Sequence, residues 1–284
     1  MRLPIHTPYK NGGGGVKVGL EPIKESDWLE IDDLFNSEIE LKKDLYDSHF
    51  NDIHKEVKES YEPQVELLDV LETHLEQYHP NHKITSVADS LPLKNASLMV
   101  QEDLVLMLPR GEEYFLGAAS LCAPSNWSLK EKFKNSLLGL HIHVPAYEKE
   151  IGSRVNNFFN NLPMEKIFQR FNWSIYENSK LFQPATSKSH IERSKTITED
   201  NAGDRLFIRV ERQTIRRLPK TQAIVFTIRV HINPLFSLKK DISLLTDLDQ
   251  ALENLSQEMK KYKSIDQIEV PLRGWLQKEI KKLG

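Results

Sequence analysis

The chain has 284 residues, and 38 lysines and arginines against 41 aspartates and glutamates give it a formal charge of −3. Hydrophobic residues make up 39% and charged residues 28%, which is typical of a globular protein with a core of its own. The near-neutral charge argues against nucleic-acid binding through a basic face, and neither a membrane span nor a secretory signal is visible, so we expect a cytoplasmic protein.

The first hundred residues are predicted to be mainly helical. After an irregular lead-in over residues 1–20, Ser26 is placed to cap a first helix. Apolar residues repeat at three- and four-residue spacing over residues 65–75, which indicates an amphipathic helix. We therefore treat residues 1–97 as a lead-in and helical region packed on the core.

Residues 98–235 change to a strand period and are predicted to form that core. Two apolar runs flank the turn signal at 109–111 (PRG), which indicates a hairpin, and helical segments follow within residues 128–161. Three more strands are predicted at residues 167–176, 205–218 and 222–232. The last two form a long antiparallel hairpin, and a pair of amphipathic helices within residues 236–284 completes the chain.

Two strands, a helical excursion and three antiparallel strands follow the order of PAS-type sensor domains. We therefore predict an α+β fold with a PAS-like five-stranded antiparallel sheet, whose helices close over one face and leave a ligand cavity. The N-terminal and C-terminal helical regions are additions around this core, within one integrated domain.

Polar and apolar residues alternate on the last strands. Even positions from 224 to 232 are all apolar, whereas the odd positions include Arg229 and His231. On the preceding strand, Arg209 and Glu211 oppose an apolar row. Either the sheet is solvated on one side, or these four side chains form the floor of a polar pocket. In such a pocket arginine would bind carboxylates and glutamate would bind an amine.

Residues 209–219 (RVERQTIRRLP) and 226–230 (FTIRV) resemble the signature of the haem-dependent oxidative N-demethylase family. Further blocks resemble that family in the expected order, at residues 19–22, 27–32, 101–104, 123–127, 140–145 and 172–174. The resemblance covers about residues 19–235. It implies a haem-binding PAS-like domain that uses O₂ to remove a methyl group from a small methylated amine.

The resemblance also implies partner proteins. Electrons would come from a separate flavin and iron–sulfur reductase, and formaldehyde would pass to a folate-binding subunit. The composition agrees, because Cys122 is the only cysteine and an iron–sulfur cluster needs more thiols. No Gly-x-Gly-x-x-Gly follows a strand either, so we predict an oxidoreductase that depends on an external reductase.

Haem iron needs an axial ligand, most often a neutral imidazole. His141 stands at the family's "IHxPVP" position, so the resemblance implies that His141 binds the iron. The chain departs from that pattern because His143 replaces the first proline. His143 and the Cys122 thiol are therefore the alternative ligands.

Four further residues are predicted to belong to the site. Trp127 and Arg209 are expected to contact the haem, the arginine through its propionates. Glu211 and Arg229 are expected to be catalytic, with Glu211 meeting the protonated amine, whose buried charge needs a carboxylate. The alternative for Glu211 is a structural ion pair across the strands, most simply with Arg229.

Two other functions fit the same sequence. One is a haem-based gas or redox sensor with a PAS-like fold, although the chain resembles no kinase, cyclase or DNA-binding output module. The other is a module that binds a small ligand without catalysis. A haem absorption spectrum separates the binding module from the enzyme and the sensor. Formaldehyde release separates the enzyme from the sensor.

Overall fold

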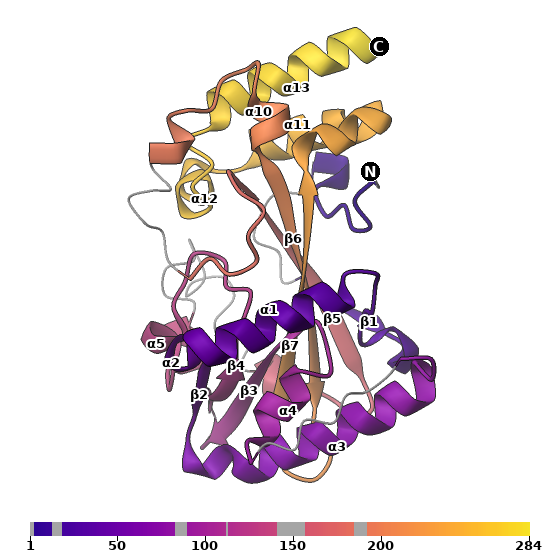
Figure 1. Ribbon diagram of the computed structural model, residues 1–284, viewed down its shortest axis with the longest axis vertical. Coiled ribbons are helices and arrows are strands. Elements are labelled where there is room, and N and C mark those ends of the chain that lie inside the picture. The colour runs from indigo at the N-terminus through magenta and orange to yellow at the C-terminus, as the bar shows by residue number, and fades with distance from the viewer. Residues whose placement is uncertain (1–2, 13–18, 83–89, 112, 141–156, 185–191) are drawn as a thin grey trace.

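The computed structural model describes residues 3–12, 19–82, 90–111, 113–140, 157–184 and 192–284. One open antiparallel sheet of seven strands forms its centre, in the order β1-β5-β6-β7-β3-β4-β2 (Figure 1). The strands are β1 Glu21–Ile23, β2 His54–Glu56, β3 Asp103–Arg110, β4 Glu113–Ser120, β5 Ile167–Tyr176, β6 Phe207–Arg217 and β7 Ile224–Pro234.

The sheet is larger than the five strands predicted. The two additional strands lie at its edges, where β1 pairs with β5 and β2 pairs with β4 over three residues each. Three residues are too few to show an alternation of polar and apolar side chains, so the sequence pattern gave no sign of them. The other five strands run β5-β6-β7-β3-β4, which places the first predicted hairpin beside the last strand.

The β6–β7 hairpin is the longest element of the sheet and is paired from Phe207 opposite Pro234 to Arg217 opposite Ile224. A helix from the N-terminal region holds its turn. The buried carboxylate of Glu66 accepts hydrogen bonds from the backbone N–H groups of Lys220 (2.6 Å) and Thr221 (2.7 Å). The predicted hairpin is therefore present, and its turn is joined to a helix distant in sequence.

Helices surround the sheet. They are α1 Phe35–Ser48, α2 Phe50–Ile53, α3 Tyr61–Tyr78, α4 Pro92–Ser97, α5 Leu129–Lys132, α6 Leu137–Leu140, α10 Ala202–Arg205, α11 Ile242–Asn254, α12 Gln257–Tyr262 and α13 Glu269–Leu283. Ser26 lies in a 3-10 turn, Glu25–Asp27, and does not cap α1, whose N-cap is Leu34. The predicted C-terminal pair is divided into three helices, because Ser256 starts α12 by accepting a hydrogen bond from the N–H of Met259 (3.2 Å).

Both faces of the sheet are covered, so the prediction of helices over one face only is wrong. Leu104 and Leu106 belong to the apolar cluster that contains residues of α3 and α4. Val105 and Met107 point the other way and belong to a cluster with Leu129 of α5 and Leu137 of α6. A third cluster joins β5 and β6 to α11 and α13 at one end of the sheet.

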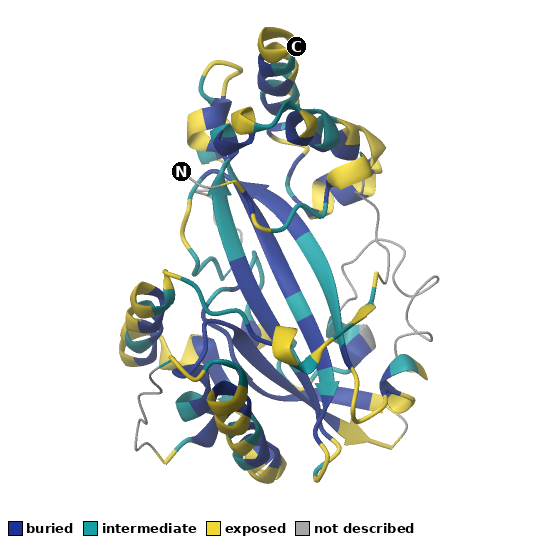
Figure 2. Cartoon of the chain, turned by 90° about the vertical axis from the view of Figure 1, so that its right-hand side faces the viewer, coloured by how far each residue is buried: buried dark blue, intermediate teal, exposed yellow. Residues whose placement is uncertain are grey.

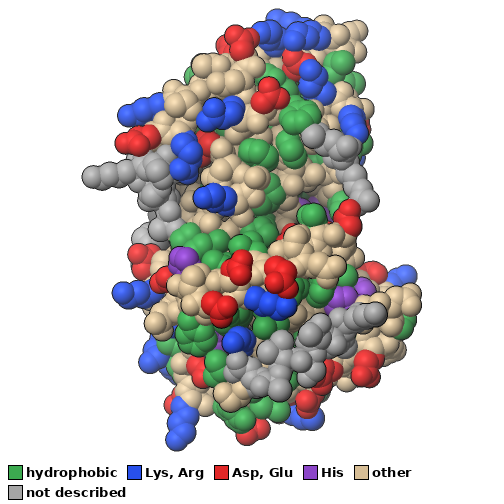
Figure 3. Space-filling view, viewed as in Figure 1, with side chains coloured by type: hydrophobic (Ala, Val, Ile, Leu, Met, Phe, Trp, Pro, Cys, Tyr) green, Lys and Arg blue, Asp and Glu red, His purple; other side chains and the backbone are tan. Residues whose placement is uncertain are grey.

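The distribution of exposed and charged residues over the surface agrees with the composition of the chain. The central strands are buried along most of their length, and the exposed residues lie mainly on the helices (Figure 2). Charged side chains of both signs are interspersed on the face shown in Figure 3, as the near-neutral net charge leads one to expect. No helix among the described residues has the length and apolar character needed to cross a membrane.

Candidate functional site

The register between β6 and β7 decides which of the predicted site residues lie together. Residues directly opposite each other on antiparallel strands share a face of the sheet. Glu211 is opposite Val230, and Arg212 is opposite Arg229. Glu211 therefore faces the side on which β7 presents its apolar row, and Arg229 faces the other side.

We call these two sides face A and face B. Face A carries Arg209 and Glu211 of β6 with Ile228, Val230 and Ile232 of β7. Face B carries Val210 and Arg212 of β6 with Arg229 and His231 of β7.

The prediction that Arg209, Glu211, Arg229 and His231 share one pocket floor is therefore wrong. The alternative of a Glu211–Arg229 ion pair is wrong for the same reason. Both arginines are only 1% exposed, so neither polar row is a solvated surface.

On face B, Arg229 binds two carboxylates from the N-terminal region. Its Nη1 donates to Glu38 Oε2 and its Nη2 donates to Asp32 Oδ2, both at 2.8 Å. The Gln101 side-chain amide donates to the same two carboxylates, to Asp32 at 2.9 Å and to Glu38 at 2.8 Å. Burial would raise the pKa of Asp32, but Gln101 and Arg229 together hold this pKa below its usual value. Arg229 thus fastens α1 and the segment before it to the sheet.

Arg212 and Lys42 fasten the same region further. Arg212 Nη1 donates to the Trp28 carbonyl (3.1 Å), and its Nη2 donates to the Asp27 carbonyl. Lys42 of α1 donates to three backbone carbonyls, including those of Val100 (2.9 Å) and Glu102 (2.6 Å). The recognised blocks at residues 27–32 and 209–230 are therefore in direct contact.

On face A, Arg209 fastens two loop segments. Its Nε donates to Ser125 Oγ (2.9 Å), its Nη1 to the Lys180 carbonyl (3.2 Å) and its Nη2 to the carbonyls of Ala123 (2.7 Å) and Leu181 (3.1 Å). Each guanidinium nitrogen thus donates to a protein acceptor. This arrangement favours a positioning role for Arg209 over the predicted contact with haem propionates.

Glu211 lies next to Arg209 in a different environment. Its carboxylate accepts hydrogen bonds from three neutral donors, Ser125 Oγ, Asn172 Nδ2 (3.3 Å) and Gln213 Nε2 (2.9 Å). The residue is 7% exposed, and among the described residues no basic group forms a salt bridge with it. Glu211 therefore presents a buried negative charge that is hydrogen-bonded but not neutralised by a contacting cation.

A lysine that shares Asn172 with Glu211 was not predicted from the sequence. Lys263, just after α12, donates from Nζ to Asn172 Oδ1 (2.8 Å) and to the Trp173 carbonyl (2.5 Å). Burial lowers the pKa of Lys263 to about 8, although the charge of Glu211 acts in the opposite direction. Ser125 and Asn172 lie in blocks that the sequence singled out, whereas Lys263 belongs to none of them.

Face A also carries an apolar surface rich in aromatic rings. The half-buried side chains packed on its cluster include Trp127, Phe133, Leu140, Phe158, Phe168, Leu181, Phe226 and Ile232. Trp127 thus lies where the predicted haem contact requires an apolar wall. Leu140 is the residue directly before His141, whereas His141 and His143 themselves lie outside the described residues.

The structure describes the third ligand candidate, Cys122, and gives it a different environment. Its side chain packs in a separate cluster with residues of α1, including Leu45 and Tyr46. Burial raises the pKa of the thiol to about 12, with Asp103 contributing. A haem thiolate ligand must be deprotonated, so this environment favours the interpretation of Cys122 as a small buried hydrophobe.

Comparison with known families gives one match that spans nearly all of these features. The family model described as haem-dependent oxidative N-demethylase, alpha subunit-like, matches residues 19–272. The matched residues include all seven strands, the anchoring groups of face B, and Glu211 and Lys263 of face A.

Replacing Arg229 with Gln leaves Asp32 and Glu38 without their cation. We expect the variant to lose about 3–5 kcal/mol of unfolding free energy in urea, because a broken buried ion pair leaves uncompensated charge. The surface variant Lys278→Gln, which removes an exposed pair with Asp200, should keep an unfolding free energy close to that of the wild type. Equal losses in the two variants would show that Arg229 is not an anchor.

The lowered pKa of Lys263 predicts that the free energy of unfolding rises with pH. Its folded-state pKa of about 8 lies below the ordinary 10.5, so between these values the unfolded chain binds more protons and folding is favoured as pH rises. Below pH 8 the full penalty of the buried ammonium remains. Relative to Lys263→Met, the wild type should gain about 2–3 kcal/mol of unfolding free energy between pH 7 and pH 10. A difference that does not change with pH would contradict this assignment.

Proposed function

This chain belongs to the haem-dependent oxidative N-demethylase alpha subunit-like family, and on that premise we propose that it binds haem against face A and oxidatively demethylates a small methylated amine. The observation that carries this proposal is the carboxylate of Glu211, which is buried, surrounded by neutral donors and free of a salt bridge among the described residues. A protonated methylamine is a small cation with apolar methyl groups. It therefore needs one buried carboxylate and apolar walls around it.

The residues of face A suit haem as well as the amine. The half-buried aromatic surface around Trp127 provides an apolar wall for a large flat macrocycle. Leu140 of this surface directly precedes His141 in the sequence, and His141 is our choice of axial ligand, with His143 as its competitor. When bound, the haem supplies an iron at which O₂ is reduced.

The protein's own residues bind the amine and handle its proton. Glu211 pairs with the ammonium group and can accept its proton, because an amine must be neutral before it is oxidised. Ser125, Asn172 and Gln213 hold the carboxylate in place, and Arg209 positions Ser125 through its Nε (2.9 Å). Arg209 thus acts on the site through its neighbour, and Arg229 supports the sheet from face B.

The overall reaction fixes what must come from partners. A tertiary or secondary methylamine, O₂, two electrons and two protons give the demethylated amine, formaldehyde and water. Cys122 is the only cysteine, so the electrons come from a separate reductase, of the flavin and iron–sulfur type. The description alpha subunit-like also points to partner subunits, of which a folate-binding protein would take the formaldehyde.

The haem ligand is tested with two matched variants. Protein expressed with sufficient haem should show a Soret band that is lost or strongly altered in His141→Ala and retained in His143→Ala, because only His141 supplies the axial nitrogen. Loss of the Soret band in His143→Ala alone would identify His143 as the axial ligand. A wild-type protein without a Soret band would favour a binding module without haem.

The role of Glu211 is tested by Glu211→Gln, which keeps the size of the side chain and removes its charge. We expect formaldehyde release from dimethylamine, measured with an artificial reductant, to lose roughly 10- to 1,000-fold in kcat/KM, while the Soret band persists. Glu131→Gln, an exposed position on α5, is the matched control and should behave as wild type. Normal amine saturation in Glu211→Gln would refute this role, and a haem-loaded wild type that releases no formaldehyde would favour a sensor.

A further inference from the structure

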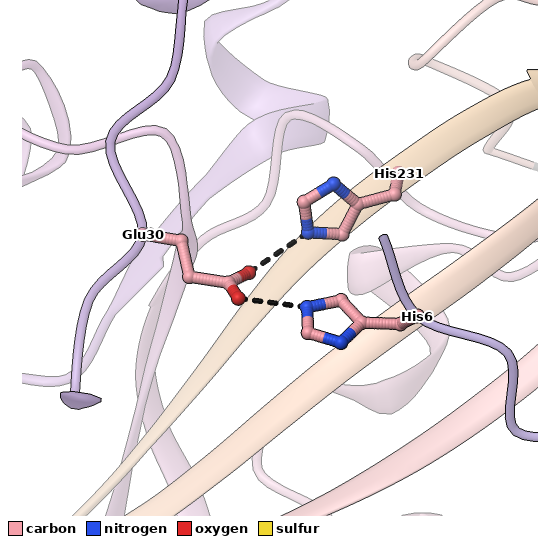
Figure 4. Close-up of side chains that lie close together, drawn as sticks. All are labelled: His6, Glu30 and His231. Atoms are coloured by element: carbon pink, nitrogen blue, oxygen red, sulfur yellow. Dashed lines mark hydrogen bonds and ion pairs between the residues drawn. The ribbon is translucent and has the colours of Figure 1, made fainter. Parts of the chain in front are cut away.

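Three metal-ligand side chains from distant segments converge on face B. His6 comes from the N-terminal segment, Glu30 from the block before α1 and His231 from β7 (Figure 4). One ligand atom from each lies within 4.8 Å of the other two. Among the described residues, no other group of three or more histidine, cysteine or acidic side chains meets this condition. Neither Arg229 nor Glu211 belongs to it.

We propose that His6, Glu30 and His231 form a binding site for one zinc-like divalent transition-metal ion. Two imidazole nitrogens and one carboxylate are the ligand set with which proteins hold zinc at sites that keep a position open. The same set, two histidines and one carboxylate, also holds other first-row divalent ions. The site goes beyond the proposed function, because it lies on the side of the sheet opposite Glu211.

The ring nitrogens of both histidines point toward the Glu30 carboxylate. His6 Nε2 lies 2.7 Å from Glu30 Oε1, and His231 Nε2 lies 2.8 Å from Glu30 Oε2. Both imidazoles thus direct the same ring nitrogen toward one carboxylate, as Figure 4 shows. Bonds of about 2.0–2.2 Å to a metal need ligand atoms slightly further apart than these, so small side-chain rotations are sufficient.

The surroundings support binding of a cation while leaving a position for water. The three side chains are 20%, 25% and 10% exposed, in the order His6, Glu30 and His231, so the cluster is neither sealed nor fully solvated. Phe171 packs on the His6 ring at 4.8 Å between centroids and restricts its rotation. The backbone N–H of Glu30 donates to Glu102 (2.9 Å), which fixes the segment that presents the carboxylate.

One neighbouring charge acts against a cation here. Arg212 Nε lies 3.7 Å from Glu30 Oε1. That guanidinium is already held by the carbonyls of Asp27 and Trp28 and by Gln169 (2.8 Å), so it does not compete for the imidazole nitrogens. Because the positive charge of Arg212 repels a metal ion, we expect the affinity of the site for the metal to be moderate.

The consequence of binding would be to fix the start of the chain. His6 precedes the matched residues 19–272, whereas Glu30 and His231 lie within them. Tyr9, three residues after His6, is fully buried in the cluster that contains Trp173 and α11. A metal ion would therefore join the N-terminal segment to β7 at one point and leave Tyr9 packed on the C-terminal helices at another.

The test uses full-length protein freed of metal by a chelator and titrated with zinc chloride in a calorimeter. The wild type should bind one zinc ion per chain, and His6→Ala, Glu30→Gln and His231→Ala should each weaken binding by roughly 10-fold or more. His49→Ala, an exposed histidine outside the cluster, is the matched control. Zinc should also raise the melting temperature of the wild type and of His49→Ala, and have less effect on the three variants.

His6→Ala keeps the result interpretable, because it changes the N-terminal segment and no strand. Cobalt(II) gives an independent readout, with visible absorption bands that are expected in the wild type and lost in His6→Ala. The proposal is wrong if the wild type binds no zinc. It is also wrong if zinc binding is unchanged in both His6→Ala and His231→Ala, and loss of binding in a His141→Ala/His143→Ala variant would then locate the ion at those residues. Neither outcome bears on haem binding or demethylation.

Discussion

The pairing of Glu211 with Val230 and of Arg212 with Arg229 is the constraint on which the rest of the molecule depends. A slip of one residue would exchange the two faces of β7 and bring Arg229 to the side of Glu211. In the observed register, one side of the sheet receives a carboxylate beside an apolar surface. The other side receives the cations that hold the N-terminal region. The proposed chemistry and the anchoring of the N-terminal region thereby lie on opposite sides of the sheet.

This separation has an energetic basis. A buried arginine needs partners for its charge and its hydrogen bonds, and Asp32 and Glu38 balance the charge of Arg229 and accept from its two Nη groups. Arg209 meets its needs with backbone carbonyls and a hydroxyl, and so leaves the charge of Glu211 without a contacting cation. Lys263 lies close enough to influence Glu211 but donates to Asn172 instead. In the proposed function, this carboxylate therefore accepts the cation of the substrate.

Much of the fold, and the family, could be predicted from the sequence. The β6–β7 hairpin, the amphipathic helices near both ends and the family followed from periodicity and from the blocks around residues 209–230. The register did not follow, because alternation shows which residues of one strand share a side but not how two strands align. The edge strands β1 and β2 were too short to show a period, and Lys263 lies just after α12, outside every block that the sequence singled out.

Paramagnetic relaxation tests most directly whether haem binds against face A, as proposed. Methyl-labelled protein is compared with ferric haem and with a diamagnetic metalloporphyrin in its place. Methyl resonances of Ile228, Val230 and Ile232, on face A, should broaden strongly with the ferric form, whereas those of Ile208 and Val210, on face B, should broaden much less. Stronger broadening of Ile208 and Val210 would place the haem on the opposite side and contradict the account.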